Sequence, residues 1–309
     1  MLEVLELQFI IFALVGIGYF VRKTIISREG QKCLTELVIN IILPCNTLSA
    51  FVQDVPKSEL YNCLWVFLLS AGIQVFCIIY GHLAYKNVEK DLQKCLTYGI
   101  IVSNAGFLGN PLAEGMFGQT GLMLASIYLT PVRIMMWSKG IALFDGTGDS
   151  RATLKKVASH PCVIACFLGI GIMTVKTFTG ITLIPGPLLS LIRTIGRCNT
   201  ALSMMVVGMI VSDVRKSDFL DLLVFRYSLE RLLLIPAVVF TVMMLMEKAC
   251  FISGIVPRLC VLFTAMPAAT TTGMLASKYG CAPAFAAKMV VISTILSIPT
   301  IFLWSMILA

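Results

Sequence analysis

Polar and conformationally special residues interrupt a long apolar run in the first half of the chain. The stretch from Asn104 to Gly118 holds two asparagines, Asn104 and Asn110, together with Pro111 and four glycines. Proline has no amide hydrogen and clashes with the preceding turn, so a helix is expected to kink or break at Pro111. Backbone groups freed in hydrocarbon must be satisfied by protein or by a wet cavity. The stretch therefore predicts either a broken helix at a substrate site or a kinked packing helix with close glycine contacts.

A second polar stretch follows Pro267 in the second half of the chain. Three threonines, Thr270, Thr271 and Thr272, come after two alanines inside another apolar run. Small residues let backbones approach closely, and hydroxyl groups can bond carbonyls that a proline has freed. The threonines are expected either to contact a substrate or to bond their own backbone.

The two prolines predict a crossover if the two halves of the chain correspond. Pro111 and Pro267 would then break equivalent helices, and the breaks would meet near the membrane midplane. Each break exposes a helix N-terminus, whose positive dipole end favours an anion. The neutral donors and acceptors at such a substrate site would be Asn104, Asn110, Thr270 and Thr271.

Two further asparagines, Asn46 and Asn199, each stand between a cysteine and a threonine in apolar surroundings. Pro44 is expected to bend the helix beside Asn46. We expect the two side chains to line a pathway or to bond across helices, and both interpretations stay open. The repeated local sequence is short, so the case for an internal repeat rests mainly on the span count and the paired prolines.

Three arginines lie within apolar segments, where a charge is costly and commonly marks a wet or paired position. Arg193 and Arg197 are four residues apart and share one helix face. Arg197 is the candidate for a substrate carboxylate, because a guanidinium binds a carboxylate through two hydrogen bonds. Snorkelling to the outer interface is the alternative, especially for Arg193. Arg133, after Pro131, presents the same choice.

The composition places the chain in a membrane. Hydrophobic residues make up 58% of its 309 residues and charged residues 13%, about half the charged share of soluble proteins. The net charge of +8 is therefore interpreted as cytoplasmic-loop chemistry, with no nucleic-acid partner. No phosphate-binding loop, nucleophile with a base or cluster of metal ligands stands out. We expect no cofactor, no metal site and no enzyme activity.

Apolar runs of about 20 residues predict ten membrane-spanning helices. Their expected ranges are 4–21, 33–52, 61–84, 95–117, 120–144, 158–177, 186–211, 222–247, 255–278 and 283–307. Ten spans divide into five and five, and an odd number per half inverts the second half relative to the first. The sequence thus predicts an all-α polytopic membrane protein of two inverted five-helix repeats, 1–144 and 158–309, joined by a cytoplasmic linker, 145–157.

Basic residues predict the orientation of these spans. They concentrate in the odd-numbered loops, among them Arg22, Lys23, Arg28, Lys32, Lys86, Lys90, Lys94, Arg151, Lys155 and Lys156. Because cytoplasmic loops carry the excess of Lys and Arg, the odd loops are placed in the cytoplasm. Both termini are then expected outside the cell, in a multi-pass protein of the plasma membrane.

The two interrupted stretches resemble the auxin efflux carrier family, which includes plant carriers and bacterial permeases for malate-like acids. The first is similar to the family pattern Asn-Thr-x-x-x-Gly-x-Pro-Leu followed by Met-Tyr-Gly, with Ala105 in place of Thr and Phe117 in place of Tyr. The second is similar to a run from Met-Pro to Lys-Tyr. The residues that carry the likeness are Asn104, Gly109, Pro111, Leu112, Met116, Gly118, Met266, Pro267, Lys278 and Tyr279. The likeness extends over essentially the whole chain.

The resemblance implies two inverted five-span repeats that cross at the two prolines. It also implies an elevator mechanism, in which a transport domain slides past a scaffold domain that forms a homodimer. By matching position, Asn104 would contact a substrate carboxylate, whereas Asn110 stands where the family often has an apolar residue. The long cytoplasmic loop of the plant carriers is absent, and the chain looks more like the bacterial permeases.

We therefore expect a secondary transporter that moves a small organic anion, such as a mono- or dicarboxylate, by an elevator-type mechanism. One alternative is a sodium-coupled organic-anion symporter of the bile-acid type, which would need carboxylate or carbonyl ligands for sodium near the crossover. Glu114 is the one acid in the first stretch. A non-transporting membrane sensor is the alternative from another class.

Overall fold

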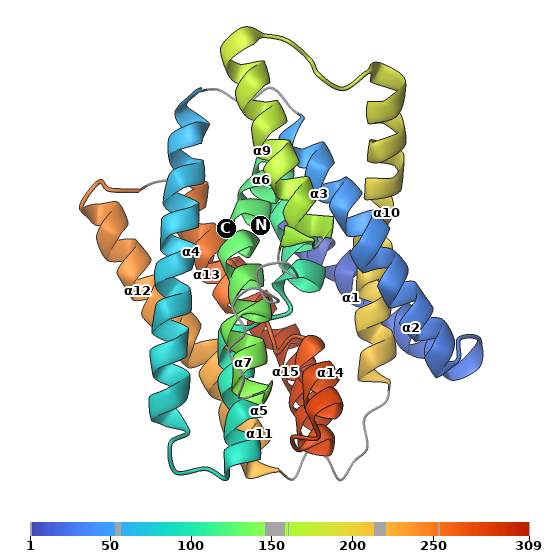
Figure 1. Cartoon of the computed structure of the whole chain (residues 1–309), viewed down its shortest axis with the longest axis vertical. Helices are drawn as coiled ribbons and strands as arrows, with labels where there is room; N and C mark the ends of the chain where they lie inside the picture. Colours follow the sequence, from blue (N-terminus) through green and yellow to red (C-terminus); the bar gives the residue numbers. More distant parts are fainter. Residues whose placement is uncertain are drawn as a thin grey trace.

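Helices account for all the regular structure of the described residues. The computed structural model describes residues 2–52, 57–145, 158–159, 161–212, 221–252 and 254–308. Its α-helices (Figure 1) are α1 Leu2–Thr24, α2 Arg28–Leu37, α3 Leu43–Phe51, α4 Lys57–Ala84, α5 Lys90–Ile101, α6 Asn110–Trp137, α7 Lys139–Asp145, α9 Pro161–Thr179, α10 Gly186–Val211, α11 Leu222–Leu229, α12 Ile235–Lys248, α13 Ile255–Thr264, α14 Thr271–Tyr279 and α15 Pro283–Leu308. Three π-helical segments, η1 Val38–Ile42, η2 Ala105–Gly109 and η4 Glu230–Leu234, join neighbouring α-helices.

Among the described residues, six helical stretches are long and apolar enough to cross a membrane. They are Arg28–Phe51, Glu59–Ala84, Pro161–Thr179, Gly186–Val211, Leu222–Lys248 and Pro283–Leu308. The expectation of an all-helical polytopic membrane protein is confirmed at this level. The plan of ten spans in two inverted repeats stays a prediction. The linker 145–157 lies outside the described residues except for Asp145, and the domain bounds stay a prediction as well.

Each π-helical segment ends two residues before a proline. Pro44, Pro111 and Pro236 follow η1, η2 and η4 respectively. A proline cannot donate to the preceding turn, and its ring clashes with the carbonyl four residues earlier. The wider π turn, with hydrogen bonds between residues five apart, makes room for the ring without ending the helix. The helix through Asn46 is thus continuous past Pro44.

The chain does not break at Pro111, which corrects the expectation from the sequence. Pro111 is in the first turn of α6, where its missing amide hydrogen has little effect. The break lies earlier, at Val102–Asn104, between α5 and η2. A second irregularity falls at Gly118, which is non-helical, with φ 63° and ψ −156°, inside α6. It separates the two ranges 95–117 and 120–144 that were expected as distinct spans.

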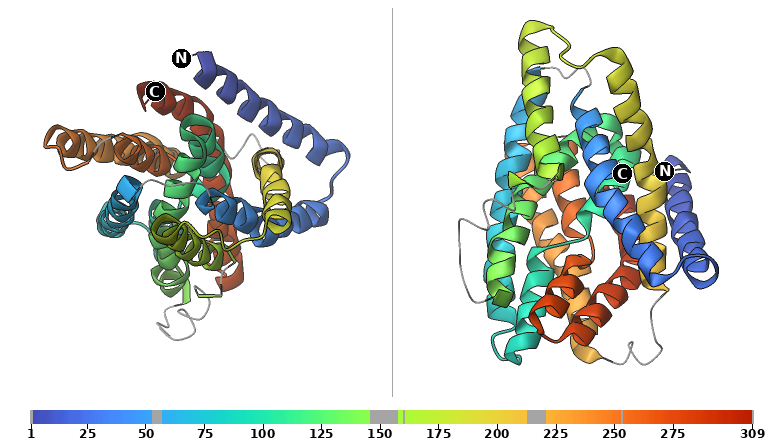
Figure 2. Two further views of the ribbon diagram at one scale, coloured as in Figure 1. Left: turned by 90° about the horizontal axis from the view of Figure 1, so that it is seen from above. Right: turned by 45° about the vertical axis from the view of Figure 1, so that its right-hand side comes forward.

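The helices pack in two groups. One comprises α1, α3, α9 and α10, and the other comprises α4 to α7 and α11 to α15. Seen from above, α1 and α10 lie on one side of the molecule and α4 and α12 on the other (Figure 2). The chain ends lie close together in both views (Figure 2). Contacts of η2 and α15 with α10 join the groups, so any site between them is bounded by both.

Backbone contact between α1 and α10 depends on two glycines. A Cβ on Gly18 would collide with the Met205 carbonyl, and one on Gly208 would collide with the Val15 carbonyl. Because these positions carry no side chains, the two helices approach closely. Such close packing stabilises contacts between membrane helices, since lipid provides no hydrophobic driving force for their association.

We predict that Gly208→Ala destabilises the protein by about 1–3 kcal/mol, because the added methyl forces the two backbones apart. Gly16→Ala is the matched control on α1, since nothing lies within 4 Å of its Cβ position. Thermal unfolding of the purified protein in detergent measures both. An equal melting temperature for Gly208→Ala and the wild type would contradict the proposed packing role.

Candidate functional site

The two broken helices pair with each other through their backbones. The Asn104 amide donates to the Pro267 carbonyl at 2.8 Å, and the Ala269 amide donates to the Val102 carbonyl at 3.3 Å. Ser103 and Ala268 form an isolated antiparallel bridge between these bonds. The breaks therefore meet, as the sequence predicted, although the first is centred on Ser103 and not on Pro111. Pro267 lies within the second break, so the two prolines do not occupy equivalent places.

Asn104 stands at the N-terminal end of η2, where the helix resumes after the break. Its backbone carbonyl accepts from the Leu108 amide at 3.0 Å, and the residue is 5% exposed. The N-terminus of α14 begins at Thr271 on the other side of the crossing. Two helix N-termini thus adjoin the paired segment, and their amide groups carry positive partial charge.

The three threonines of the second break have different surroundings. Thr270 lines a cavity. The Thr271 hydroxyl accepts from the Tyr98 hydroxyl at 2.9 Å, which ties α14 to α5. Thr272 is fully buried, and its hydroxyl has no partner among the described residues. Within that part of the chain, no hydrogen bond joins the Thr271 or Thr272 hydroxyl to its own backbone.

Asn110 is fully buried in the first turn of α6. Neither polar atom of its amide has a hydrogen-bond partner in the described part of the chain. A buried polar side chain without partners is uncommon, because desolvation is then uncompensated. Asn110 therefore has unused hydrogen-bonding capacity close to the crossover, which a water or a bound molecule would satisfy.

A cavity of 660 Å³ reaches the crossover between the two helix groups. Its walls come from α2, the end of α10, the N-terminal part of α14, and α15. Thr270 and Gly273 place the start of α14 in its lining. No atom lies within 4 Å of the Cβ position of Gly273, which leaves the adjacent helix end open.

Three cations and one carboxylate line this cavity. Arg28 and Lys32 come from α2, Lys288 from α15, and the carboxylate belongs to Glu36. Arg28 and Lys32 entered the sequence analysis only as loop charges, and Lys288 was missed. The signal was present, since Lys288 is the single charged residue within the apolar sequence of α15. A half-buried lysine in such a helix commonly marks a functional position.

Arg231 is a second residue that was not predicted from the sequence to have a role at the site. It is 3% exposed, and its guanidinium donates from Nε to the Met266 carbonyl and from Nη1 to the Ile100 carbonyl, each at 3.0 Å. Its neighbour Glu230 pairs with Arg226 at 2.7 Å. The signal was an arginine inside an apolar span, five residues before Pro236.

Asn46 and Asn199 lie apart from this cavity lining. Asn46 is buried on α3 beside the Glu114 carboxyl group, and a Cβ on Gly196 of α10 would lie 2.9 Å from its Cα. Asn199, buried on α10, accepts from the Ser203 hydroxyl at 3.0 Å. Asn46 thus lies where α3 packs against α10, whereas the Asn199 contact is within α10; their roles toward a substrate stay a prediction.

The three arginines singled out from the sequence fall into two settings. Arg193 and Arg197 are exposed on α10 and do not line the cavity. Arg133 is 5% exposed, lies near Cys162 of α9, and has an Nη1 without a partner among the described residues. The structure does not bring these arginines to the crossover cavity.

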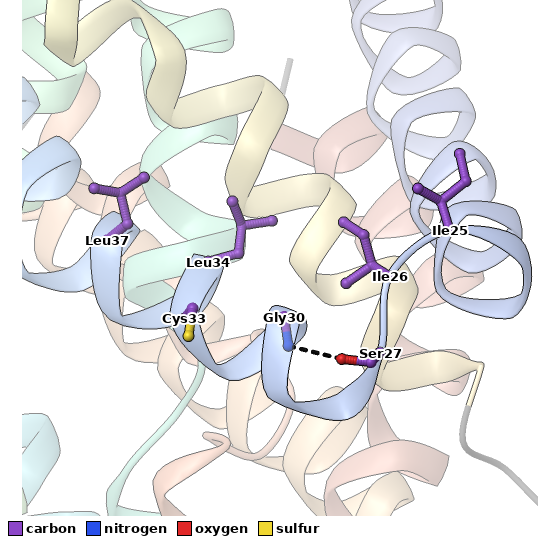
Figure 3. A pocket seen from close by; sticks show the side chains of 7 residues that line it. All are labelled: Ile25, Ile26, Ser27, Gly30, Cys33, Leu34 and Leu37. Atoms are coloured by element: carbon purple, nitrogen blue, oxygen red, sulfur yellow. Dashed lines mark hydrogen bonds between the residues drawn. The ribbon is translucent and has the colours of Figure 1, made fainter.

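A separate hollow of 470 Å³ lies where α1 turns into α2 (Figure 3). Ile25, Ile26, Leu34 and Leu37 supply most of its wall, and the Ser27 hydroxyl caps α2 by accepting from the Gly30 amide at 3.2 Å. It has no charged residue in its lining, so the crossover cavity is the better candidate for a polar substrate.

Comparison with known proteins identifies the family. The model of a family described as membrane transport protein matches residues 3–305. The chain belongs to this family, the auxin efflux carrier family. An uncharacterized transporter of Methanocaldococcus jannaschii is 28% identical over 321 residues, covering 98% of each chain. An uncharacterized transporter of Methanothermobacter thermautotrophicus is 26% identical over 167 residues, covering 52% of this chain and 54% of its own.

For this member of the auxin efflux carrier family, we predict that a cysteine at position 287 reacts with a water-soluble maleimide. Ala287 is exposed and lines the cavity, whereas Ala286 beside it is fully buried. Ala286→Cys is therefore the matched control, because burial disfavours the reactive thiolate. Both are made after the exposed Cys33, Cys198 and Cys250 are replaced by serine. Equal labelling of the two variants would contradict a wet cavity at this place.

Proposed function

We propose that the protein is a secondary transporter that moves a small organic anion, a mono- or dicarboxylate, across the plasma membrane. The observation that carries this proposal is the cavity at the crossover, whose lining holds three cations and one carboxylate. A carboxylate entering it meets Arg28, Lys32 and Lys288 and then the helix end at Thr270. Charged hydrogen bonds and helix N-termini both favour an anion there.

The substrate carboxylate is proposed to bind at the crossing itself. Asn104 stands at the end of the first break, and Asn110, which follows η2, has an amide without partners in the described part of the chain. Neutral amides and helix-end N–H groups bind an anion without holding it too tightly for release. Apolar residues of α15, such as Val290 and Val291, would contact the remainder of the substrate.

The proposed mechanism is of the elevator type, in a ten-span protein of two inverted five-helix repeats. Its support is that α1, α3, α9 and α10 pack mainly with one another, beside the helices that carry the crossover. The crossover group would move with the substrate against the other group, which would pair with a second copy in a homodimer. The excess of basic residues orients the cavity mouth toward the cytoplasm and both termini outside.

Uptake into proteoliposomes across a panel of mono- and dicarboxylates tests the proposal. We expect at least one of these acids to be transported, and we expect Asn104→Ala to reduce that uptake severely while the protein keeps its melting temperature. Leu188→Ala, at an exposed position on α10, serves as the control that leaves uptake unchanged. If a folded wild-type protein moves no carboxylate, the proposed substrate class is wrong; normal kinetics in Asn104→Ala would remove this residue from the site.

The cavity charges predict opposite effects of two neutral substitutions. Lys288→Gln removes a cation and is expected to raise the KM for a carboxylate about tenfold, the effect of losing one charged hydrogen bond. Glu36→Gln removes the carboxylate from the same cavity and is expected to lower KM. Initial uptake rates over a substrate series measure both. A change of the same sign in the two variants would refute electrostatic attraction in the cavity.

A further inference from the structure

A single buried guanidinium connects the two half-helices that end at the crossover. Arg231 donates to the carbonyl of Ile100, in the last turn of α5, and to the carbonyl of Met266, just past the end of α13. The last carbonyl groups of a helix lack partners within the helix and carry the negative end of its dipole. Arg231 therefore satisfies both C-terminal ends with one positive charge.

The position of Arg231 follows from a local feature of its own helix. It is the second residue of η4, the π-helical segment that precedes Pro236. The segment sits between α11 and α12, and a π turn changes the direction in which following side chains point. The geometry directs the guanidinium into the protein at the point where α5 and α13 end.

No carboxylate neutralises this charge within the described residues. Its neighbour Glu230 pairs with Arg226 instead. Glu230 also accepts from the Tyr85 hydroxyl. An unpaired buried cation is costly, so the two carbonyl groups and the two helix dipoles are its compensation.

We infer that Arg231 is the fixed cation of the crossover, a positioning residue that takes the place a bound metal cation would otherwise hold at the two helix C-termini. By neutralising those negative ends, it leaves the positive N-terminal ends at η2 and α14 to attract the substrate anion. This inference rests on the proposed function and names what sets its anion preference.

The two hydrogen bonds of Arg231 also bear on whether transport is coupled to sodium. A sodium ion at the crossover would need several oxygen ligands, and the Ile100 and Met266 carbonyls already accept from Arg231. The described residues contain no group of three His, Cys, Asp or Glu side chains that could hold a metal ion. A sodium ion at this crossing would therefore compete with the Arg231 guanidinium for these two carbonyls.

The first test uses the wild-type protein without any substrate. Its melting temperature in detergent is measured in sodium chloride, potassium chloride and N-methylglucamine chloride at equal ionic strength. We expect the same value in the three salts. Stabilisation specific to sodium would overturn the inference, whether or not a carboxylate is transported.

The second test compares variants in proteoliposomes. Arg231→Gln keeps an amide NH2 donor group but loses the charge, and we expect the KM for the transported carboxylate to rise about tenfold or more with a smaller change in kcat. Arg231→Lys keeps the charge and is expected to recover most of the affinity. Arg258→Gln is the control, because it removes an exposed cation from α13 without touching the end of that helix.

The outcomes separate the inference from the proposed function. If a carboxylate is transported and Arg231→Gln shows the wild-type KM, the inference is wrong and the proposed function stands. If Arg231→Gln does not fold, Arg231→Lys decides: an affinity near the wild-type value supports a role of the charge, and a loss as large as that expected for Gln overturns it. If no carboxylate is transported, the proposed function is wrong. The comparison of melting temperatures in the three salts still tests the inference about Arg231.

Discussion

Two helices are broken inside an apolar protein, and each break must be satisfied by protein groups because hydrocarbon supplies none. The breaks solve this requirement jointly. The Asn104 amide and the Pro267 carbonyl pair, as do the Ala269 amide and the Val102 carbonyl, so each break is the hydrogen-bond partner of the other. The neighbouring helices are arranged around this short antiparallel contact, and the cavity opens where its helix ends remain accessible.

The contact also creates an electrostatic asymmetry. At each break one half-helix ends with free carbonyl groups and the next begins with free amide groups. Arg231 bonds carbonyls from both C-terminal ends, whereas the N-terminal end of α14 adjoins a cavity lined by Arg28, Lys32 and Lys288. The proposed preference for an anion follows from this asymmetry. It needs no single strong substrate ligand, and weak binding suits a carrier that must also release its substrate.

Prolines act differently in this protein according to their neighbours. Pro44, Pro111 and Pro236 each follow a π-helical segment and leave the helix continuous, since the wider turn accommodates the ring. Pro267 instead lies within a non-helical segment whose carbonyl serves the partner break. The expectation of a break at Pro111 was wrong. It considered the missing amide hydrogen of proline, but it did not consider that a π turn before the proline can accommodate the ring.

The sequence by itself determined the all-helical membrane class and the family, and it pointed to the two interrupted stretches. Hydrophobic length is a local property, and the range 186–211 expected from it coincides with α10. Only the tertiary structure decided that the first break lies at Ser103, that Lys288 and Arg28 share one cavity, and that Arg231 reaches both half-helices. These facts depend on which residues distant in sequence come into contact, and local periodicity carries no information about that. Arg197 illustrates the limit: its residue type suited a carboxylate, but the side chain is exposed on α10 and does not line the cavity.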